Sequence, residues 1–220
     1  MTIDRSPQSI SERRALSVTY QKGAYILRSK NELMLRSFEY RLYPTNKQEA
    51  RLYSTFHLCS EMYNLLLTEH EAVYEQAGIS LSRYDLNNRI TGIKQHDTRF
   101  MSVYSLVLQN QADRLSKAFN NFFRRCQENK QDASIKVGYP RYKRLIHSIT
   151  YPANNGSFKL IANKIIVSKI GKIPIVLHRP IMGTIKTLTI KRNRRASGSR
   201  YSAANWMTKN QNLIEAKRLA

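Results

Sequence analysis

The last third of this sequence is almost without acidic residues. Residues 136–220 contain one carboxylate, Glu215, beside 18 lysines and arginines. A nuclease site with two metal ions needs several carboxylates close together. In residues 34–135 the acids are spread among basic partners, and their one local cluster, Glu69, Glu71 and Glu75, is better explained as a solvated helix face. The chain by itself is therefore predicted to have no catalytic residues, no metal ligands and no cofactor.

Other signatures of function are also missing. The two cysteines, Cys59 and Cys126, form no CxxC pair, which argues against a structural zinc site. Both fall at apolar helix positions, where buried free thiols in a reducing compartment are expected. The five histidines lack metal-binding spacing, and neither a glycine-rich phosphate loop nor GxSxG occurs. Without an apolar run of ~20 residues or the apolar core of a signal peptide, we expect a cytoplasmic protein with no membrane partner.

Positive charge is what the sequence has in excess. The formal net charge is +22. Residues 34–135 are nearly balanced, with 13 basic and 11 acidic side chains, whereas residues 136–220 carry a net charge of +17. So many uncompensated charges repel one another unless a polyanion neutralises them. Because this segment shows no strongly amphipathic basic helix, nucleic acid is favoured over a membrane surface as the partner.

Hydrophobic periodicity predicts a strand near the start of the chain. Residues 1–33 are polar and weakly patterned, and we expect them to be a disordered leader or a mis-assigned start before Met34. In residues 34–44, Phe38, Tyr40 and Leu42 alternate with polar positions, which is the period of a β-strand. Pro44 closes that strand.

A helical domain is predicted for residues 45–131. Thr45 and Gln48 have the spacing of a capping box, and Gly78 is a suitable end for the helix that follows. Ser82 and Asp85 open a second helix, and a third covers about residues 102–129. The apolar stripes are predicted to form a core: Leu52, Phe56, Cys59, Tyr63, Leu66 and Ala77 in the first helix, and Val103, Leu106, Val107, Leu115, Phe119, Phe122, Phe123 and Cys126 in the third.

Short β-rich runs follow Gln131, at residues 158–161, 164–168, 173–178, 185–193 and 200–205. Glycine and proline separate them. The order of one strand, three helices and about five strands predicts an α+β fold. We expect a small antiparallel β-barrel or sheet, resuming at residues 132–206, with a three-helix domain inserted after its first strand.

Two basic clusters are candidates for binding. In GYPRYKR (residues 138–144), cations can neutralise phosphates while tyrosines stack on unpaired bases, and a basic turn between helix and sheet is the alternative. KRNRR (residues 191–195) resembles a phosphate clamp at a strand end, and a solubilising loop is the alternative. The candidate residues are Tyr139, Arg141, Tyr142, Lys143, Arg144, Lys191, Arg192, Arg194 and Arg195, with Arg124 and Arg125 of the third helix.

A third stretch, YRLYP (residues 40–44), places Arg41 next to aromatic rings, although the edge of a buried strand explains it more simply. Periodicity alone predicts no helix-turn-helix.

Four stretches in order, FEYRLYPTNKQEARL, CSEMYNLLL, GYPRYKR and KIGKIPIVLHRPIMGTIKTLTIKR, resemble the opening of the TnpB/OrfB-type transposon proteins. Members of that family are RNA-guided DNA endonucleases, ancestral to type V CRISPR effectors. The resemblance runs from about Met34 to about Trp206.

The resemblance implies a wedge-type barrel interrupted by a helical recognition domain, which together hold a structured guide-type RNA and DNA. It places Arg41, Tyr43 and Lys47 at the junction of strand and helix, and it matches Arg141, Tyr142 and Lys143 to the family's Gly-Tyr-Pro-Arg-Phe/Tyr-Lys stretch. A full-length family member is a further partner to expect, and the location would be cytoplasmic and nucleoid-associated.

The sequence departs from the family in one respect. The family's RuvC-like nuclease domain, with three carboxylates for a divalent metal such as Mg²⁺ and a CxxC-type zinc element, has no counterpart here, and residues 207–220 have the character of an aberrant or disordered tail. We therefore expect a truncated transposase-family protein that binds RNA and DNA without cleaving them. One alternative is a nuclease-lacking regulator of transcription or transposition. Another, an ordinary basic DNA-binding protein, leaves the ordered motifs unexplained.

Overall fold

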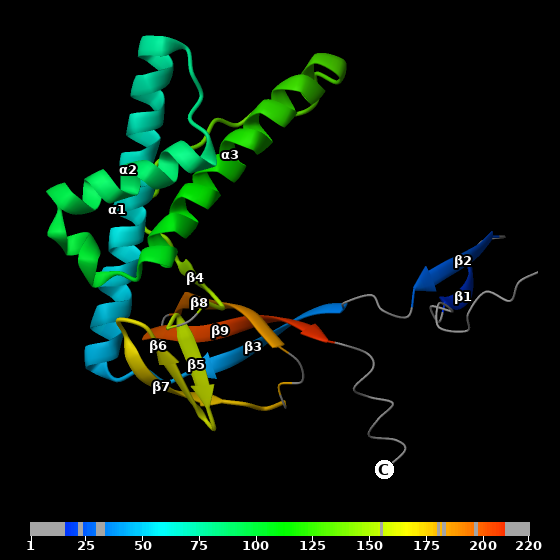
Figure 1. The fold of residues 1–220 in the computed structure, drawn as a ribbon, viewed down its shortest axis with the longest axis vertical. Coiled ribbons are helices and arrows are strands. Elements are labelled where there is room, and N and C mark those ends of the chain that lie inside the picture. Colours follow the sequence, from blue (N-terminus) through cyan, green and yellow to red (C-terminus); the bar gives the residue numbers. More distant parts are fainter. Residues whose placement is uncertain are drawn as a thin grey trace, which may run out of the picture.

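The computed structural model of the chain describes residues 16–21, 24–29, 34–154, 156–179, 181, 184–195 and 198–209. Within these residues the three α-helices lie together at one end of the molecule and the main sheet at the other (Figure 1). The elements are, in order, β1 (Leu16–Gln21), β2 (Ala24–Ser29), β3 (Met34–Leu42), α1 (Asn46–Ala77), α2 (Arg83–His96), a 3-10 helix η2 (Thr98–Ser102), α3 (Ser105–Gln131), β4 (Ser148–Pro152), β5 (Phe158–Ile161), β6 (Lys164–Val167), β7 (Gly171–Val176), β8 (Thr184–Arg195) and β9 (Gly198–Lys209).

Seven strands form one antiparallel sheet in the order β4-β8-β9-β3-β7-β6-β5. The sheet curls into a nearly closed barrel. The first strand of the barrel, β3, pairs with β9 on one side and with β7 on the other, although the three helices separate it from both in the sequence. The predicted α+β fold, a small antiparallel barrel with a helical domain after its first strand, is confirmed.

Local side-chain hydrogen bonds explain where α1 begins and ends. The backbone N–H of Gln48 donates to Thr45 Oγ1 (3.4 Å), and Gln48 Oε1 accepts from the N–H of Thr45 (3.0 Å), which is the predicted capping box. At the other end Gly78 adopts φ +66°, a left-handed conformation that favours glycine. The second predicted box, between Ser82 and Asp85, opens α2.

The third helix begins later than the sequence predicted, at Ser105 rather than near Ser102. Residues 98–102 form the 3-10 helix η2 instead. The cause is local: Asp97 Oδ1 accepts the backbone N–H of Arg99 (2.9 Å) and caps this short turn. The turn ends at Val103, whose N–H donates to the carbonyl of Phe100 (3.2 Å).

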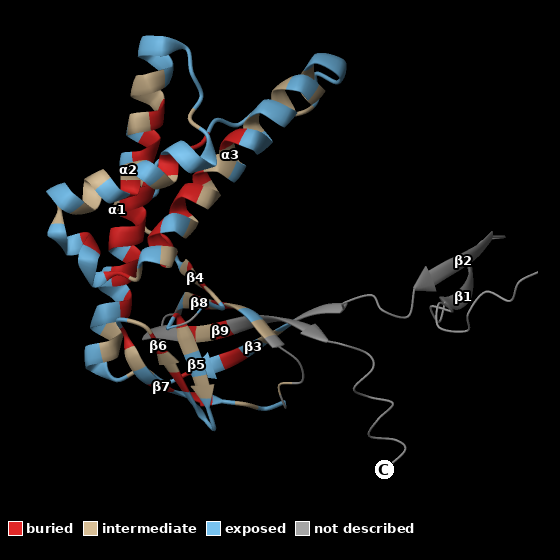
Figure 2. Ribbon diagram, in the orientation of Figure 1, coloured by how far each residue is buried: buried red, intermediate tan, exposed pale blue. Residues whose placement is uncertain are grey.

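Buried residues lie along α1 and along α3, and further buried residues lie in the strands of the barrel (Figure 2). The predicted core is largely right, but five positions differ: Ala77 and Phe123 are exposed, and Leu106, Phe122 and Cys126 are only partly buried. The two exposed residues lie toward the carboxyl ends of α1 and α3, where the two helices diverge (Figure 1).

Within the seven-stranded sheet, one strand, β4, was not predicted. In β4, Ile149 and Tyr151 are buried between half-buried neighbours, and the strand pairs antiparallel with β8 at the edge of the sheet. The run is only five residues long and ends in Pro152, so its alternation is hard to distinguish from a loop.

The predictions for the two ends of the chain stay predictions. Most of the range 1–33 lies outside the described residues, and its described strands β1 and β2 form a separate two-stranded antiparallel sheet. Of the predicted tail at 207–220, residues 207–209 belong to β9, and residues 210–220 lie outside the described residues.

Candidate nucleic-acid interface

The basic segment at residues 138–147 is fixed along helix α1 by hydrogen bonds to its main chain. Asn64 Oδ1 accepts the N–H of Lys143 (2.7 Å), while Asn64 Nδ2 donates to the carbonyl of the same residue (3.0 Å). The N–H of Ile146 donates to the buried Ser60 Oγ (2.7 Å). Because Ser60 and Asn64 are one turn apart on α1, the segment runs along the helix in extended form, and the side chains of Arg141, Lys143 and Arg144 stay exposed.

The two tyrosines of this segment have different surroundings. Tyr142 is 55% exposed, and its hydroxyl donates to Glu71 Oε2 (2.7 Å). Tyr139 packs edge-on against Phe119 and Phe122 of α3, with ring centres 5.6 and 5.2 Å away. Burial, followed by the nearby charge of Glu71, raises the pKa of Tyr139. Tyr139 therefore holds the segment against α3, while 47% of its surface stays exposed.

Tyr53 of α1 lies where the basic elements meet. Tyr53 is 42% exposed, and the guanidinium carbon of Arg192 in β8 stands 4.9 Å from the centre of its ring. The N–H of Arg192 donates to the carbonyl of His147 (2.9 Å), at the end of the basic segment. The structure thus brings parts of the two predicted clusters, GYPRYKR and KRNRR, to one face of α1.

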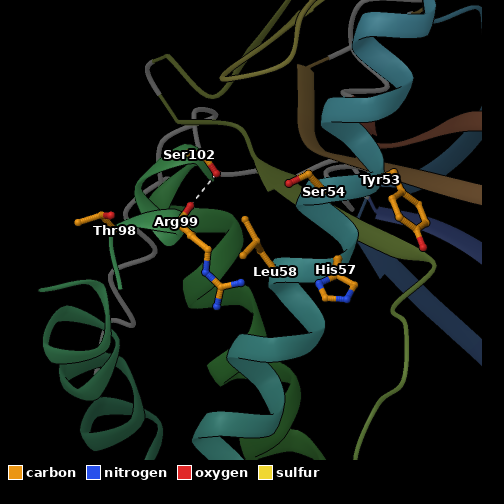
Figure 3. A pocket seen from close by; sticks show the side chains of 7 residues that line it. All are labelled: Tyr53, Ser54, His57, Leu58, Thr98, Arg99 and Ser102. Carbon is orange, nitrogen blue, oxygen red and sulfur yellow. Dashed lines mark hydrogen bonds between the residues drawn. The ribbon is translucent and has the colours of Figure 1, made fainter. Parts of the chain in front are cut away.

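Three surface hollows share Tyr53 in their lining. One of about 580 Å³ lies between α1 and η2, where Figure 3 shows Tyr53 and His57 on the helix and Arg99 on the 3-10 turn. A second, of about 460 Å³, lies between α1 and the basic segment and includes Lys143 and Arg144. A third, of about 350 Å³, lies between the start of α1 and β8–β9. The three hollows therefore surround the ring of Tyr53.

Arg41, Tyr43 and Lys47 stand at the strand-to-helix junction, where the family resemblance placed them. The guanidinium carbon of Arg41 lies 4.9 Å from the centre of the Tyr43 ring, and all three side chains are exposed. None of them lines a hollow that contains Tyr53. In the described part of the chain they form a separate exposed group.

The other candidates are apart from Tyr53 or only partly described. Arg124 forms an ion pair with Glu128 (2.6 Å), and Arg125 donates to backbone carbonyls of Asn121 (3.2 Å) and Gly138 (3.5 Å). Both lie in the distal half of α3, away from the barrel (Figure 1). Lys191 Nζ lies 3.9 Å from a carboxylate oxygen of Glu39. The side chains of Arg194 and Arg195 lie outside the described residues.

The glutamates of α1 make separate contacts. Glu69 pairs with Arg89 of α2 (3.0 Å), and Glu71 accepts the Tyr142 hydroxyl. His57 Nδ1 lies 3.1 Å from Glu61, at the helical spacing that the sequence showed. Across the described residues there is no group of three or more His, Cys, Asp or Glu side chains placed to hold a metal ion.

The sequence did not identify three of the residues that build this surface. Tyr53, Ser60 and Asn64 are ordinary helix residues in the sequence, and their roles depend on elements distant along the chain. The one available signal was spacing: Ser60, Asn64 and Thr68 recur every four residues, which gives α1 a polar stripe beside its apolar one.

A family model described as a helix-turn-helix domain, of the IS605 OrfB type, matches residues 34–78. The matched residues comprise β3 and α1, and a turn and the second helix, α2, follow directly. The match supports an N-terminal region of an IS605 OrfB/TnpB-type transposase. Comparison with curated proteins gave no significant match. None of the helices in the described part of the chain has the length and apolarity needed to cross a lipid bilayer.

Proposed function

We propose that this chain is a transposase-related nucleic-acid-binding protein of the OrfB/TnpB type. It binds DNA and structured, guide-type RNA through the basic barrel and the helical domain. The observation that carries the proposal is the Tyr53 surface, where cations from the basic segment and from β8 gather around exposed tyrosine rings. Cations neutralise phosphates and aromatic rings stack on bases, so this pairing suits nucleic acid better than an acidic protein.

The proposed activity is binding without cleavage. Two-metal phosphoryl transfer requires clustered carboxylates, and residues 136–220 supply only Glu215. Three of the acids of α1, Glu69, Glu71 and Glu61, are engaged with Arg89, Tyr142 and His57, as ordinary helix-surface groups are. This shortage of clustered carboxylates beside a basic surface also favours a second candidate function, a regulator that represses transcription or transposition by occupying a nucleic-acid site.

The test uses the full chain with a labelled RNA stem-loop and a labelled DNA duplex, followed by fluorescence anisotropy. We expect binding of both at low salt. The same mixture of RNA and matching DNA with Mg²⁺ should leave the DNA intact on a denaturing gel. Guide-dependent cleavage would refute the non-catalytic part, and failure to bind either probe at low salt would refute the whole proposal.

A reporter gene that carries the bound sequence separates the two candidate functions. Repression that depends on the protein favours the regulator. Unchanged expression, with binding intact in vitro, favours a transposase-related binding protein without a regulatory role.

A further inference from the structure

Of the three hollows that share Tyr53, one has a lining free of carboxylates together with cations that form no ion pair in the described part of the chain. The hollow between the start of α1 and β8–β9 includes Glu49. The hollow beside η2 includes Arg99, whose guanidinium already pairs with Asp97 (2.7 Å) and Glu61 (3.4 Å). The hollow of about 460 Å³ is lined by Tyr53, His57, Tyr142, Lys143, Arg144, Leu145 and His147.

The cations of this hollow have charge available for a ligand. Lys143 and Arg144 are exposed, and no carboxylate in the described part of the chain pairs with either. The nearest acids are engaged at its margins, because Glu61 binds His57 and Glu71 accepts the Tyr142 hydroxyl. Lys143 Nζ lies 5.7 Å from the centre of the Tyr63 ring, a contact that leaves its charge unneutralised. An anion that enters the hollow would therefore meet two cations that no carboxylate neutralises.

The wall that carries these cations is held in place before any ligand arrives. Asn64 binds both the N–H and the carbonyl of Lys143, and Ser60 binds the N–H of Ile146. Little backbone entropy remains to be lost when the flanking Arg144 side chain meets a phosphate. Such preorganisation increases affinity without new contacts.

The size and lining of the hollow suit one nucleotide. A volume of about 460 Å³ is of the size of small-ligand sites, which span ~300–1,000 Å³. In a duplex the bases stay stacked on one another, and only an unpaired base can be splayed out onto an aromatic side chain. Arg192 lies over the partly exposed Tyr53 ring, so a base would stack on the face that Arg192 leaves open. Lys143 and Arg144 line the same hollow and can take the adjoining phosphate.

We infer that this hollow receives a single unpaired nucleotide, with its base on Tyr53 and its phosphate on Lys143 and Arg144. The inference rests on the proposed function and adds to it a preference: this face of α1 binds nucleic acid at an unpaired position rather than along a continuous duplex. RNA and DNA share this chemistry, and the probes distinguish them.

The experiment compares two stem-loops that differ by one bulged nucleotide in the stem, each made in RNA and in DNA. Affinities of the full chain are measured by fluorescence anisotropy. We expect the bulged probe to bind about tenfold more tightly than its fully paired counterpart, the size of effect that one base–aromatic stack typically has. A second readout places the fluorescent base 2-aminopurine at the bulge, where stacking on a tyrosine should quench it.

Three variants assign the effect to the ring. Tyr53→Ala should abolish the preference and the quenching while the paired probe still binds, and Tyr53→Phe should retain both. Tyr84→Ala is the matched control, because Tyr84 is 73% exposed on α2 and lines none of the three hollows. It should behave as the unmodified chain does.

The possible results separate the two proposals. Equal binding of bulged and paired probes by the unmodified chain, or a preference that survives Tyr53→Ala, overturns the single-nucleotide site and leaves the proposed binding function standing. Absence of binding to every probe at low salt overturns both. A preference seen only in RNA, or only in DNA, supports the site and identifies the sugar that it accepts.

Discussion

The guanidinium carbon of Arg192 lies 4.9 Å from the centre of the Tyr53 ring, which joins strand β8 to helix α1. The two residues are far apart in the sequence and belong to different parts of the fold, the barrel and the helical domain. Next to this contact, the backbone of Arg192 donates to the carbonyl of His147. Barrel, helix α1 and basic segment therefore meet at the Tyr53 ring.

Replacing Arg144 should weaken nucleic-acid binding through charge alone. Arg144→Gln removes a cation that lines the hollow at Tyr53, so we expect weaker binding of every probe and a salt dependence whose slope falls by about one unit, as for the loss of one phosphate contact. Affinities measured over a range of salt concentrations give the slope. Arg83→Gln is the control, because Arg83 of α2 pairs with Asp113 of α3 and lines none of the three hollows at Tyr53. Equal slopes for the two variants would contradict the assignment.

Asn64 should stabilise the fold through the basic segment. Asn64→Ala removes two hydrogen bonds to the backbone of Lys143, and we expect a loss of about 1–2 kcal/mol in the free energy of unfolding. Urea denaturation measures it. Asn121→Ala, at an exposed position on α3, makes the same change in helix propensity without those bonds. If both variants are equally stable, the segment is held by other contacts.

His70 should make stability depend on pH. It is buried, its ring stacks on Phe119 with centres 3.8 Å apart, and burial lowers its pKa from the ordinary 6.5, with Glu71 acting in the opposite direction. Below pH 6.5 the His70 imidazole is therefore protonated more readily in the unfolded chain than in the folded chain. The stabilising effect is complete above pH 6.5 and is lost as the pH falls below it toward the lowered folded-state value.

Denaturation midpoints at a series of pH values test this effect. We expect the stability of the His70→Gln variant to fall less steeply below pH 6.5 than that of the unmodified chain. We also expect the variant to be less stable at neutral pH because packing is lost. His96→Gln, at an exposed position at the end of α2, should leave the decline unchanged. A decline of the same steepness in both variants would place its cause elsewhere.

The two thiols should react at very different rates. Burial raises the pKa of Cys59 to about 12, so little thiolate exists at pH 8, whereas Cys126 is partly exposed. We expect one thiol per chain to react with a thiol reagent under native conditions and both to react in denaturant. Cys126→Ser should remove the native reaction. Rapid labelling of that variant would mean that Cys59 is accessible.

Local signals in the sequence predicted much of the fold. The capping boxes at Thr45 and Ser82, the left-handed Gly78 and the alternation before Pro44 are short-range patterns whose physical cause lies within a few residues. Strand β4 was missed because it is short and gains its stability from pairing with β8, which no local pattern reveals.

The site was less predictable than the fold. The exposed cations of GYPRYKR were found from composition, but their connection to Arg192 depends on the meeting of β8 and α1 around Tyr53. Arg124 was predicted to bind nucleic acid on charge alone, and in the structure Glu128 one turn away pairs with it. The sequence shows that a charge is present, but the neighbours of that charge in the fold decide whether it is free to bind a ligand.

The central claim is that the Tyr53 surface binds a polyanion through uncompensated positive charge. The most direct test measures the association constant of the unmodified chain for a labelled RNA stem-loop from low to high salt. The account predicts tight binding at low salt and a steep linear fall of log K with log salt concentration, with about 0.7–0.9 units of slope for each phosphate neutralised. Binding that is absent at low salt, or unaffected by added salt, would contradict it.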